Sequence, residues 1–335
     1  MKRFLQPVVR WDGLLDAVAV LAMVSTVAAF AASWWWLCEL TVHFRWQYAA
    51  CLVLLGVGRG LQGRWRWAAV YGVGAMVNVL AVSGGCGPSA AVADHGGVRP
   101  DLRVLLVNVH TANTEHTRVE AYVNQEAPDV VVLIEVDSRW LVQLTQLARS
   151  YPHRIEAPRN DNFGIALFSR LPLEYGRVVD LGEAGVPSVE ARVRVGENLV
   201  WVVGTHPLPP SHRENARLRD QQLHAVAAHM AGLRGPRVLV GDLNATPWSP
   251  VFRALVAQSG LLDTRCGRGW QPTWPAGMPL LWIPLDHALI SDDLAVWERR
   301  VGPSVGSDHY PLLVGVSWKK SVASEAPIPR NSGSL

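Results

Sequence analysis

VLVGDLNATP, residues 238–247 of this 335-residue sequence, carries the pattern from which the fold can be predicted. Its apolar half is short and rich in valine, which is typical of a buried β-strand. The run stops at Gly241 and is followed at once by Asp242 and Asn244. A buried strand that ends in a carboxylate and an amide places both groups at one edge of a sheet, where active sites commonly lie.

The same pattern recurs along residues 101–317 and predicts an α/β domain. Short apolar runs predict the strands Leu102–Val107, Asp129–Val136, Phe163–Phe168, Ser188–Val195, Leu199–Gly204, Val238–Val240, Ala288–Ile290 and Leu312–Val316. Helical spacing predicts helices around Val119–Val123, over Arg213–Leu233 and over Ser249–Gln258. Ser188–Val195 alternates polar and apolar residues, as a half-exposed strand does. Some predicted strands follow one another directly and others are separated by a predicted helix. We therefore expect mixed sheets at the centre of a layered domain.

Polar side chains collect where these strands begin or end. They are Asn108, Glu135, His206, Asp242, Asn244, Asp286, His287, Asp308 and His309. Each one alone is explained by a turn or a cap. Together they predict one crevice lined by carboxylates, amides and imidazoles. Such hard oxygen donors suit Mg²⁺ or Mn²⁺, and the set points to metal-assisted phosphoryl hydrolysis.

The first third of the chain has the pattern of a membrane domain. Leu14–Leu37, Tyr48–Val57 and Trp67–Val82 are apolar runs with tryptophans near their ends, which predicts three transmembrane helices within residues 1–82. The alternative is one signal anchor followed by buried helices of a soluble protein. Lys and Arg gather before the first run and between the second and third. By the positive-inside rule, we expect a multi-pass plasma-membrane protein whose C-terminal domain is extracytoplasmic.

The remaining segments complete the expected organisation. Residues 83–100 are rich in Gly and Pro and predict a flexible linker, and residues 318–335 predict a disordered tail. An oxidising exterior would permit a Cys86–Cys266 disulfide, although the spacing does not require one. Of 31 Lys and Arg and 28 Asp and Glu, seven and four lie in residues 1–98, which leaves 24 of each for the rest. That neutral balance argues against a nucleic-acid substrate.

Seven segments together resemble the motifs of the endonuclease/exonuclease/phosphatase superfamily. They are LLVNVH, DVVVLIEV, GIALFSR, VVGTHP, VLVGDLNATP, PLDHALI and GSDHYPLL, in that order. The resemblance implies a four-layered α/β/β/α sandwich of the deoxyribonuclease I type over residues 101–317. It also implies a Mg²⁺-dependent phosphoric ester or pyrophosphate hydrolase, with Mn²⁺ as the other candidate metal.

The resemblance further implies a role for each matching residue. Glu135 would be the principal metal ligand, with Asn108 and Asp308 beside it. Asp242 would orient or deprotonate water, His309 would stabilise the transition state, and Asp286 would orient that imidazole. The residues implied at the substrate phosphate or the pocket wall are Asn108, Asn113, Asn162, His206 and Asn244, of which His206 and Asn244 also count as catalytic.

Membrane spans before such a domain resemble the Van J type membrane proteins of actinobacteria, which are associated with teicoplanin resistance. That resemblance implies hydrolysis of a lipid-linked phosphate or pyrophosphate of the cell wall. The stretch Gly269–Pro284 contains three tryptophans and no charge, so it either dips into the membrane interface or packs within the domain. A phospholipid phosphodiesterase of the sphingomyelinase type, an extracellular nuclease and an inactive binding domain remain as alternatives. The cluster Arg213, Arg217 and Arg219 is the feature that favours a nuclease, or else one solvated helix face.

Overall fold

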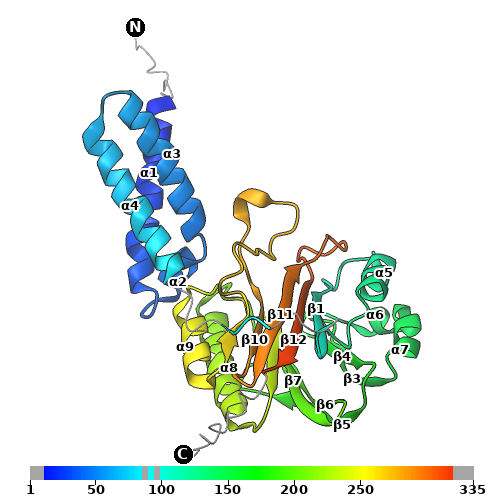
Figure 1. The fold of residues 1–335 in the computed structure, drawn as a ribbon. Coiled ribbons are helices and arrows are strands. Elements are labelled where there is room, and N and C mark those ends of the chain that lie inside the picture. The colour runs from blue at the N-terminus through cyan, green and yellow to red at the C-terminus, as the bar shows by residue number, and fades with distance from the viewer. Residues whose placement is uncertain (1–10, 85–89, 94–98, 320–335) are drawn as a thin grey trace, which may run out of the picture.

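The computed structural model describes residues 11–84, 90–93 and 99–319, which form a helical bundle and an α/β domain (Figure 1). The bundle contains α1 (Trp11–Ala28), the short 3-10 helix η1 (Ala29–Ala31), α2 (Trp36–Val42), α3 (Arg45–Leu61) and α4 (Trp65–Ser83). It stands on one side of the α/β domain, and α2 lies at the junction between the two.

Two helical segments of the bundle are long and apolar enough to cross a membrane. They are Gly13–Ala31 and Trp65–Ser83, and α2 with α3 makes a third if the bent pair, with 63° between its helices, is one span. The first segment is shorter than the predicted Leu14–Leu37, because the chain turns after Ala31 and starts α2 at Trp36. The predicted loop between the first two spans is therefore largely helical.

The outer surface of the bundle is apolar. Its exposed large side chains include Leu21, Val24, Val27, Phe30, Leu54, Val73 and Leu80. Exposed tryptophans lie next to helix ends, with Trp34 and Trp35 just before α2 and Trp65 as the first residue of α4. A soluble bundle of this size would bury such side chains, whereas lipid-facing helices expose them to acyl chains.

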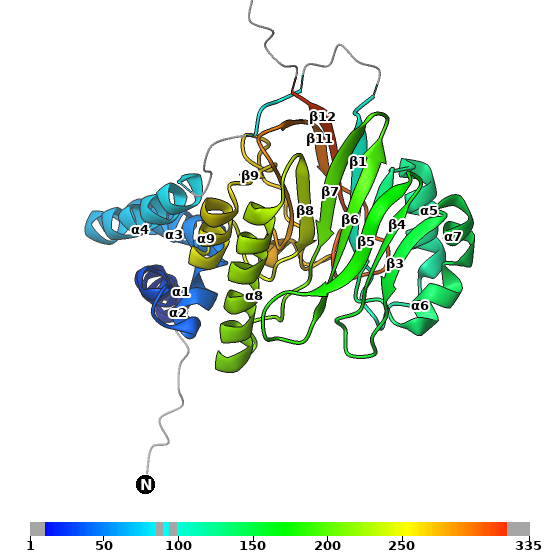
Figure 2. The same ribbon diagram turned by 90° about the horizontal axis from the view of Figure 1, so that it is seen from below.

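The first sheet has the strand order β11-β12-β1-β2-β4-β3. Its strands are β1 (Leu102–Asn108), β2 (Val130–Ile134), β3 (His153–Ala157), β4 (Ile165–Ser169), β11 (Leu294–Val301) and β12 (Leu312–Trp318). The central pair β1 and β2 is parallel, and the other pairs are antiparallel. Helices α5 (His116–Glu126), α6 (Ser138–Gln143) and α7 (Thr145–Ser150) cover its outer face (Figure 2).

The second sheet has the order β5-β6-β7-β8-β10-β9. Its strands are β5 (Leu173–Asp180), β6 (Pro187–Val195), β7 (Asn198–Gly204), β8 (Arg237–Asp242), β9 (Leu262–Asp263) and β10 (Asp286–Ile290). Only β7 and β8 are parallel among the paired strands described. Helices α8 (Arg213–Gly232) and α9 (Pro250–Ser259) cover the face turned away from the first sheet.

Three apolar layers hold the domain together, and they make it the four-layered sandwich that was expected. Val104, Val132, Val202 and Val240 belong to the core between the two sheets. A second core packs the first sheet on α5–α7, and a third packs the second sheet on α8 and α9. The alternation of side chains along each strand produces this division, because one face meets the other sheet and the opposite face meets helices.

The structure adds strands that the sequence pattern did not predict. β3 and β5 are edge strands with exposed, polar residues, so their apolar signal is weak. β11 was also missed. The predicted half-exposed strand over Ser188–Val195 is instead mostly buried as β6. Its Glu190 is buried because it pairs with Arg177 and His229.

Part of the predicted linker is packed on the α/β domain. The backbone N–H of Ala93 donates to the carbonyl of Val296, and that of Val296 donates to Ala91, so residues 90–93 lie along β11. The buried Ala90 joins the core between the sheets. Residues 85–89, 94–98 and 320–335 lie outside the described chain, as does Cys86 of the considered disulfide.

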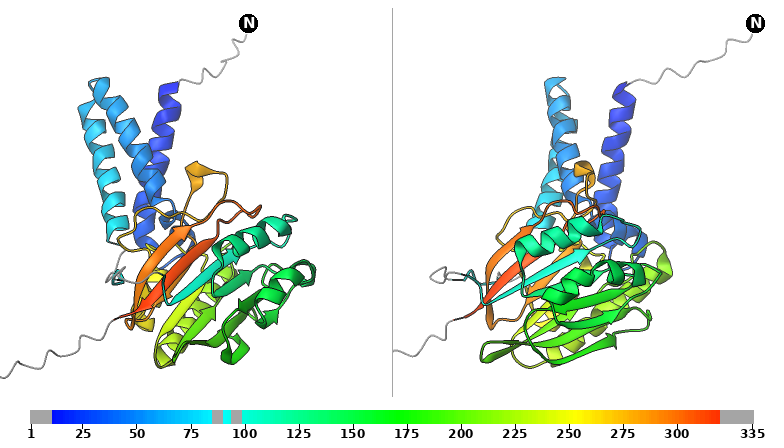
Figure 3. Two further views of the ribbon diagram at one scale, coloured as in Figure 1. Left: turned by 45° about the vertical axis from the view of Figure 1, so that its right-hand side comes forward. Right: turned by 90° about the vertical axis from the view of Figure 1, so that its right-hand side faces the viewer.

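The bundle and the α/β domain meet through buried polar groups on α2. Glu39 accepts a hydrogen bond from Ser249 (2.7 Å) and pairs with Arg219 of α8 (3.3 Å). His43 lies 3.0 Å from the hydroxyl of Thr246, and the indole of Trp248 donates to the carbonyl of Val42. Because these groups are buried, water cannot solvate a charge whose partner has been removed. Each buried charge is therefore stable only while its partner is present. Figure 3 shows the bundle rising from this junction.

Candidate active site

The strand ends that carry polar residues meet at one edge of the sandwich. β1 and β2 are parallel, so Asn108 at the end of β1 and Glu135 just after β2 emerge side by side. β7 and β8 do the same for His206 and Asp242. β10 runs antiparallel to β8 with Asp286 directly opposite Asp242. The two sheets therefore deliver their polar ends to a shared crevice.

A buried triad lies at the centre of this crevice. His309 Nδ1 is 2.8 Å from Asp286 Oδ2, and its Nε2 is 3.4 Å from Asp242 Oδ2. All three side chains are buried. Asp286 is held in turn by its own backbone N–H, which donates to Thr273 Oγ1 at 3.0 Å. One imidazole thus bridges a carboxylate deep in the domain and a carboxylate at the pocket surface.

Electrostatics within the triad favour a charged imidazole. Burial alone would lower the pKa of His309, but the carboxylates of Asp286 and Asp242 raise it to about 10. Burial likewise would raise the pKa of Asp286, and the adjacent His309 lowers it below its ordinary value. For Asp242 burial prevails and raises the pKa of the carboxyl group. The site accordingly holds an imidazolium beside a carboxylate that accepts protons readily.

His206 faces the same carboxylates from the second sheet. Its Nε2 is 3.7 Å from Asp242 Oδ2 and 4.0 Å from Glu135 Oε1. Burial, and then the nearby charge of His309, lower the pKa of His206 to about 4. A neutral ring can accept or donate a hydrogen bond at a substrate oxygen. Its Nδ1 atom has no hydrogen-bond partner among the residues described.

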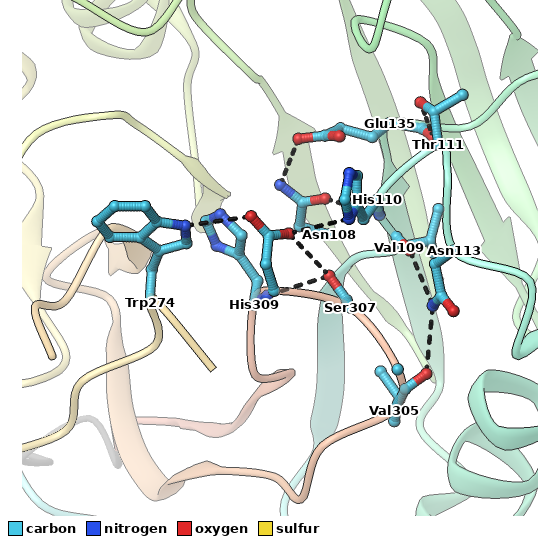
Figure 4. Close-up of polar contacts among 12 residues, drawn as sticks. Asn108, Val109, His110, Thr111, Asn113, Glu135, Trp274, Val305, Ser307 and His309 are labelled. Carbon is cyan, nitrogen blue, oxygen red and sulfur yellow. Dashed lines mark hydrogen bonds and ion pairs between the residues drawn. The ribbon is translucent and has the colours of Figure 1, made fainter. Parts of the chain in front are cut away.

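Glu135 and Asn108 form the opposite wall. The amide of Asn108 donates to Glu135 Oε1 at 2.8 Å, and its Oδ1 accepts the backbone N–H of His110 at 3.0 Å (Figure 4). Burial raises the pKa of Glu135. Glu135 also has a left-handed backbone, with φ of 63°. Such a conformation is uncommon for residues other than glycine and is often found at functional sites.

Asp308 lies beside this wall and is half-exposed. Its Oδ1 is 3.4 Å from His110 Nδ1, and its Oδ2 accepts a hydrogen bond from the indole of Trp274 at 3.2 Å. His309, the next residue, receives support from Ser307, whose hydroxyl accepts the His309 backbone N–H at 3.1 Å. The turn before β12 therefore aims Asp308 and His309 into the crevice from one loop.

The loop after β8 is fixed around its carboxylate. The backbone N–H of Asn244 donates to Asp242 Oδ1 at 2.9 Å, and the Asn244 side chain donates to the carbonyl of Pro207 at 3.0 Å. Asn244 has φ of 47°, again left-handed. Arg219 donates to the Asn244 carbonyl at 3.0 Å, so the pair between Glu39 and Arg219 extends to the active-site loop. The bundle also contacts this loop directly, through Glu39 with Ser249 and His43 with Thr246.

The donor set fits a divalent cation. Asp242, Asp286 and His309 present ligand atoms within 4.8 Å of one another, and this group could hold a metal ion. Glu135 and Asp308 add carboxylate oxygens on the other wall, where the side-chain amide nitrogen of Asn108 faces Glu135. The raised pKa of buried Glu135 marks a carboxylate without a strong cationic partner, a condition that a bound cation relieves. Oxygen donors of this kind suit hard divalent cations, of which Mg²⁺ and Mn²⁺ are examples.

A cavity of about 550 Å³ opens in front of these residues. Glu135, His206, Asp242, Asn244, Asp308 and His309 line its polar part, together with the predicted Asn162. Asn108 and Asp286 stand behind that surface, in contact with Glu135 and His309. The apolar part comes from Phe163, Trp274, Ile283 and Leu285, and from Leu40 and Phe44 of the bundle.

Asn113 is the predicted pocket residue that the structure places elsewhere. Its side-chain amide donates to the carbonyls of Val109 and Val305 at 3.1 and 3.3 Å, and its Oδ1 accepts the backbone N–H of Glu115. Figure 4 shows it turned away from Glu135 and His309. Asn113 holds two loops together and is not part of the pocket wall. This is a local turn function that the amide-rich NVHTAN segment could equally have indicated.

Sequence reasoning missed several residues of the site. His110 follows Asn108 by two positions and faces Asp308, yet a lone histidine gives no signal. Thr273 fixes the backbone of Leu285 and Asp286 from an earlier part of the loop that leads into β10. Leu40, His43 and Phe44 reach the pocket from the predicted loop between two membrane spans. No local pattern in that loop indicates a pocket, because the contact exists only after the two parts pack together.

Comparisons with known proteins agree with this architecture. The sequence profile described as the endonuclease/exonuclease/phosphatase family matches residues 105–309. No curated protein matches the chain. The structure of an endonuclease/exonuclease/phosphatase from Beutenbergia cavernae is 26% identical, with a TM-score of 0.55 over 66% of this chain and 72% of that one.

Two more distant structures share the fold alone. The human Nocturnin catalytic domain has a TM-score of 0.54 at 20% identity and covers 66% of this chain and 96% of its own. A mannosyl-6-phosphatase from Bacteroides thetaiotaomicron has a TM-score of 0.53 at 17% identity, over 65% of this chain and all of its own (100%).

Proposed function

The chain belongs to the endonuclease/exonuclease/phosphatase family, and from that premise we propose a membrane-held, metal-dependent phosphohydrolase. Its substrate would be a lipid-linked phosphate or pyrophosphate of the cell envelope. The family match supports hydrolysis of a phosphoric ester as the reaction class. The substrate class is inferred from the surroundings of the site.

One observation carries the proposal. The cavity in front of Asp242 and His309 is also lined by Leu40 and Phe44, which belong to the helical bundle. A polar catalytic wall and an apolar wall from the membrane side share one pocket. A molecule with a phosphate at one end and an acyl or prenyl chain at the other matches both walls.

Each residue of the site would have its own role in the hydrolysis. A water attacks phosphorus and forms the new P–O bond, while the bond to the leaving oxygen breaks. Asp242 accepts the proton of that water, and burial suits it to this role because a raised pKa makes the carboxylate a better base. The His309 imidazolium, kept charged and oriented by Asp286, stabilises negative charge on the phosphate oxygens. His206 and Asn244 would hydrogen-bond those oxygens.

Glu135, Asn108 and Asp308 would hold the divalent cation. When bound, Mg²⁺ or Mn²⁺ supplies a Lewis acid that polarises the phosphate. We assign the cation to this wall because both ring nitrogens of His309 already face carboxylates. Removal of the cation by EDTA should therefore stop hydrolysis and leave the triad intact.

The helical bundle supports a multi-pass protein with an extracytoplasmic active site. Arg64 and Arg66 lie at the end of the bundle remote from the α/β domain, where α3 connects to α4. Cations favour the cytoplasmic side, which would place the α/β domain outside. There the pocket would meet lipid-linked intermediates of the cell wall, and their hydrolysis would contribute to teicoplanin resistance.

A direct assay tests the substrate class. The full chain in nanodiscs is incubated separately with undecaprenyl pyrophosphate, lipid II, sphingomyelin and plasmid DNA, with Mg²⁺ or with EDTA. We expect Mg²⁺-dependent release of phosphate from a polyprenyl substrate, and none from the Asp242→Ala variant. Cleavage of sphingomyelin alone would make the protein a phospholipid phosphodiesterase, and cleavage of DNA alone would make it a nuclease. Either result overturns the proposed substrate.

Two of the three arginines in the cluster that favoured a nuclease already have carboxylate partners. Arg217 pairs with Glu214 at 2.7 Å, and buried Arg219 pairs with Glu39 and Asp220. Their charges are already compensated within the protein. Binding of a long polyanion normally draws on unpaired Lys and Arg, so this helix face supports the lipid-linked substrate over DNA.

The physiological part of the proposal has its own test. Expression of the wild-type chain in a teicoplanin-sensitive actinobacterium should raise the minimal inhibitory concentration, and the Asp242→Ala variant should not. Equal resistance with both chains would show that hydrolysis is not the source of resistance. Membrane fractions probed for each chain control for expression.

A further inference from the structure

The segment Gly269–Pro284, here called the apolar loop, connects β9 to β10 and contains the short helix η2 (Pro279–Leu281). It has no Asp, Glu, Lys or Arg. Its tip is strongly exposed, with 87% of Leu280 and 54% of Met278 accessible to solvent. An exposed, uncharged tip of this kind is unfavourable in water and indicates a contact surface.

Both ends of the apolar loop are fastened to the start of α3. The Trp270 ring packs edge-on against Trp46, with 5.7 Å between centroids, and stacks on Trp248 at 6.1 Å. At the other end, Gln47 donates to the carbonyl of Trp282 at 2.9 Å. The loop therefore leaves the domain at the level where α3 begins, and it rises beside the bundle (Figures 1 and 3).

The base of the apolar loop belongs to the active site. Trp274 donates to the Asp308 side chain at 3.2 Å, and the backbone N–H of Ala276 donates to the Asp308 carbonyl at 2.6 Å. Trp274 and Ile283 line the cavity, whereas Leu280 does not. One segment thus joins the pocket wall to a tip that points along the bundle.

We propose that the tip of the apolar loop inserts into the same leaflet that surrounds the adjoining end of the bundle. Met278, Leu280 and Leu281 would enter the acyl-chain region, and Trp270 and Trp282 would lie at the headgroup level, which indole rings favour. The loop would then hold the mouth of the pocket against the headgroups. This inference rests on the proposed membrane embedding of the bundle, and it names a lipid surface as the partner of the loop.

Depth-dependent fluorescence quenching tests the insertion without measuring activity. A bimane label is placed at Leu280→Cys in the full chain with its native cysteines replaced by alanine, reconstituted in phosphatidylcholine–phosphatidylglycerol nanodiscs. Leu21→Cys on α1, at an exposed position of the bundle (66%), is the membrane control, and Val142→Cys on α6 (69%) is the aqueous control. Nitroxide lipids labelled near the headgroup or deeper in the chain serve as quenchers.

We expect the label at position 280 to be quenched by the shallow nitroxide at least half as strongly as the label at position 21. The label at position 142 should be unaffected. Quenching at 21 but not at 280 overturns the loop inference and leaves the proposed function standing. Absence of quenching at 21 overturns the membrane embedding, and the loop inference with it.

A substitution at the tip supplies a second readout. Leu280→Asp places a charge where the leaflet should be, so it should abolish quenching at a label on Met278→Cys. It should also raise KM at least fivefold for a polyprenyl phosphate in nanodiscs, with hydrolysis of a short, water-soluble phosphodiester unchanged within twofold. Val142→Asp is the matched control. Equal losses on both substrates would show that the loop merely maintains the fold.

Discussion

Asp286→Asn should make the activity fall in alkaline solution, where the wild-type activity should not fall. Asp286 Oδ2 lies 2.8 Å from His309 Nδ1, both side chains are buried, and the pKa of His309 is raised to about 10. The asparagine has nearly the same volume and removes only the charge. The perturbation therefore isolates the electrostatic contribution of one carboxylate to one imidazolium.

The magnitude follows from the geometry. Two unit charges about 4 Å apart at an effective dielectric of about 20 interact by about 4 kcal/mol. Since about 1.4 kcal/mol corresponds to one pH unit, loss of the Asp286 charge should lower the pKa of His309 by about three pH units, to about 7. The other carboxylate, Asp242 Oδ2, lies 3.4 Å from His309 Nε2 and prevents the pKa of His309 from falling further.

The direction of the pH effect on kcat follows from the form of His309 that is active, which is the protonated imidazolium. In the wild type His309 stays charged below about pH 10, so its contribution to kcat is constant between about pH 7 and 9. In Asp286→Asn the imidazolium is lost above about pH 7, and kcat should fall about tenfold per pH unit, or about 100-fold at pH 9. Phosphate release at saturating substrate and Mg²⁺ measures both profiles.

Asp129→Asn provides the matched control. Asp129 is another buried aspartate, and it accepts the backbone N–H of Arg103 at 2.8 Å at the start of β2, away from His309. Its pH profile should follow the wild type. If the Asp286→Asn profile also runs parallel to the wild type between pH 6 and 9, the charge of His309 does not depend on Asp286 and the argument fails.

Three further changes test the site, the junction and the topology. Asp242→Ala or His309→Ala should abolish Mg²⁺-dependent phosphate release while circular dichroism and gel filtration stay unchanged; residual activity above one per cent would contradict their assignment. Glu39→Ala removes the buried one of the two carboxylates that pair with Arg219 and leaves Asp220 as the other. Unfolding should become easier by about 3 kcal/mol, the lower end of the cost of breaking a buried ion pair. This is measured as a lowered Tm in nanodiscs and compared with Glu39→Gln, which keeps the hydrogen bond from Ser249. Alkaline phosphatase fused after residue 319 should be active and the same reporter fused after Gly63 silent; the reverse pattern would invert the topology.

Much of the fold could be predicted from local sequence. Four strands, β1, β2, β7 and β8, are short apolar runs. Their side chains are removed from water only if both faces of the sheet are covered. The edge strand β5 was not predicted because it is largely exposed and interrupts its apolar residues with Glu174, Gly176 and Arg177. A strand lies at the edge of a sheet when no other strand pairs with one of its sides. The sequence of the strand itself does not show whether such a neighbour exists.

The residues of the candidate site could be predicted from the sequence, but their arrangement in space could not. Glu135, Asp242 and His309 each stand at a strand end, where polar residues are conspicuous after an apolar run. That they share a pocket depends on the pairing of β1 with β2 and of β8 with β10. Asn113 and Asn162 looked alike in the sequence, and only packing placed one at a loop junction and the other at the cavity.

The strands, the apolar helices and the chemistry of the side chains follow from local sequence, because each depends on residues within a few positions of one another. Tertiary structure alone decided that α2 supports the catalytic loop and that Leu40 and Phe44 complete the pocket. Glu39 and Arg219 are 180 positions apart, and their partnership arises from burial of two opposite charges at a surface that neither segment forms alone.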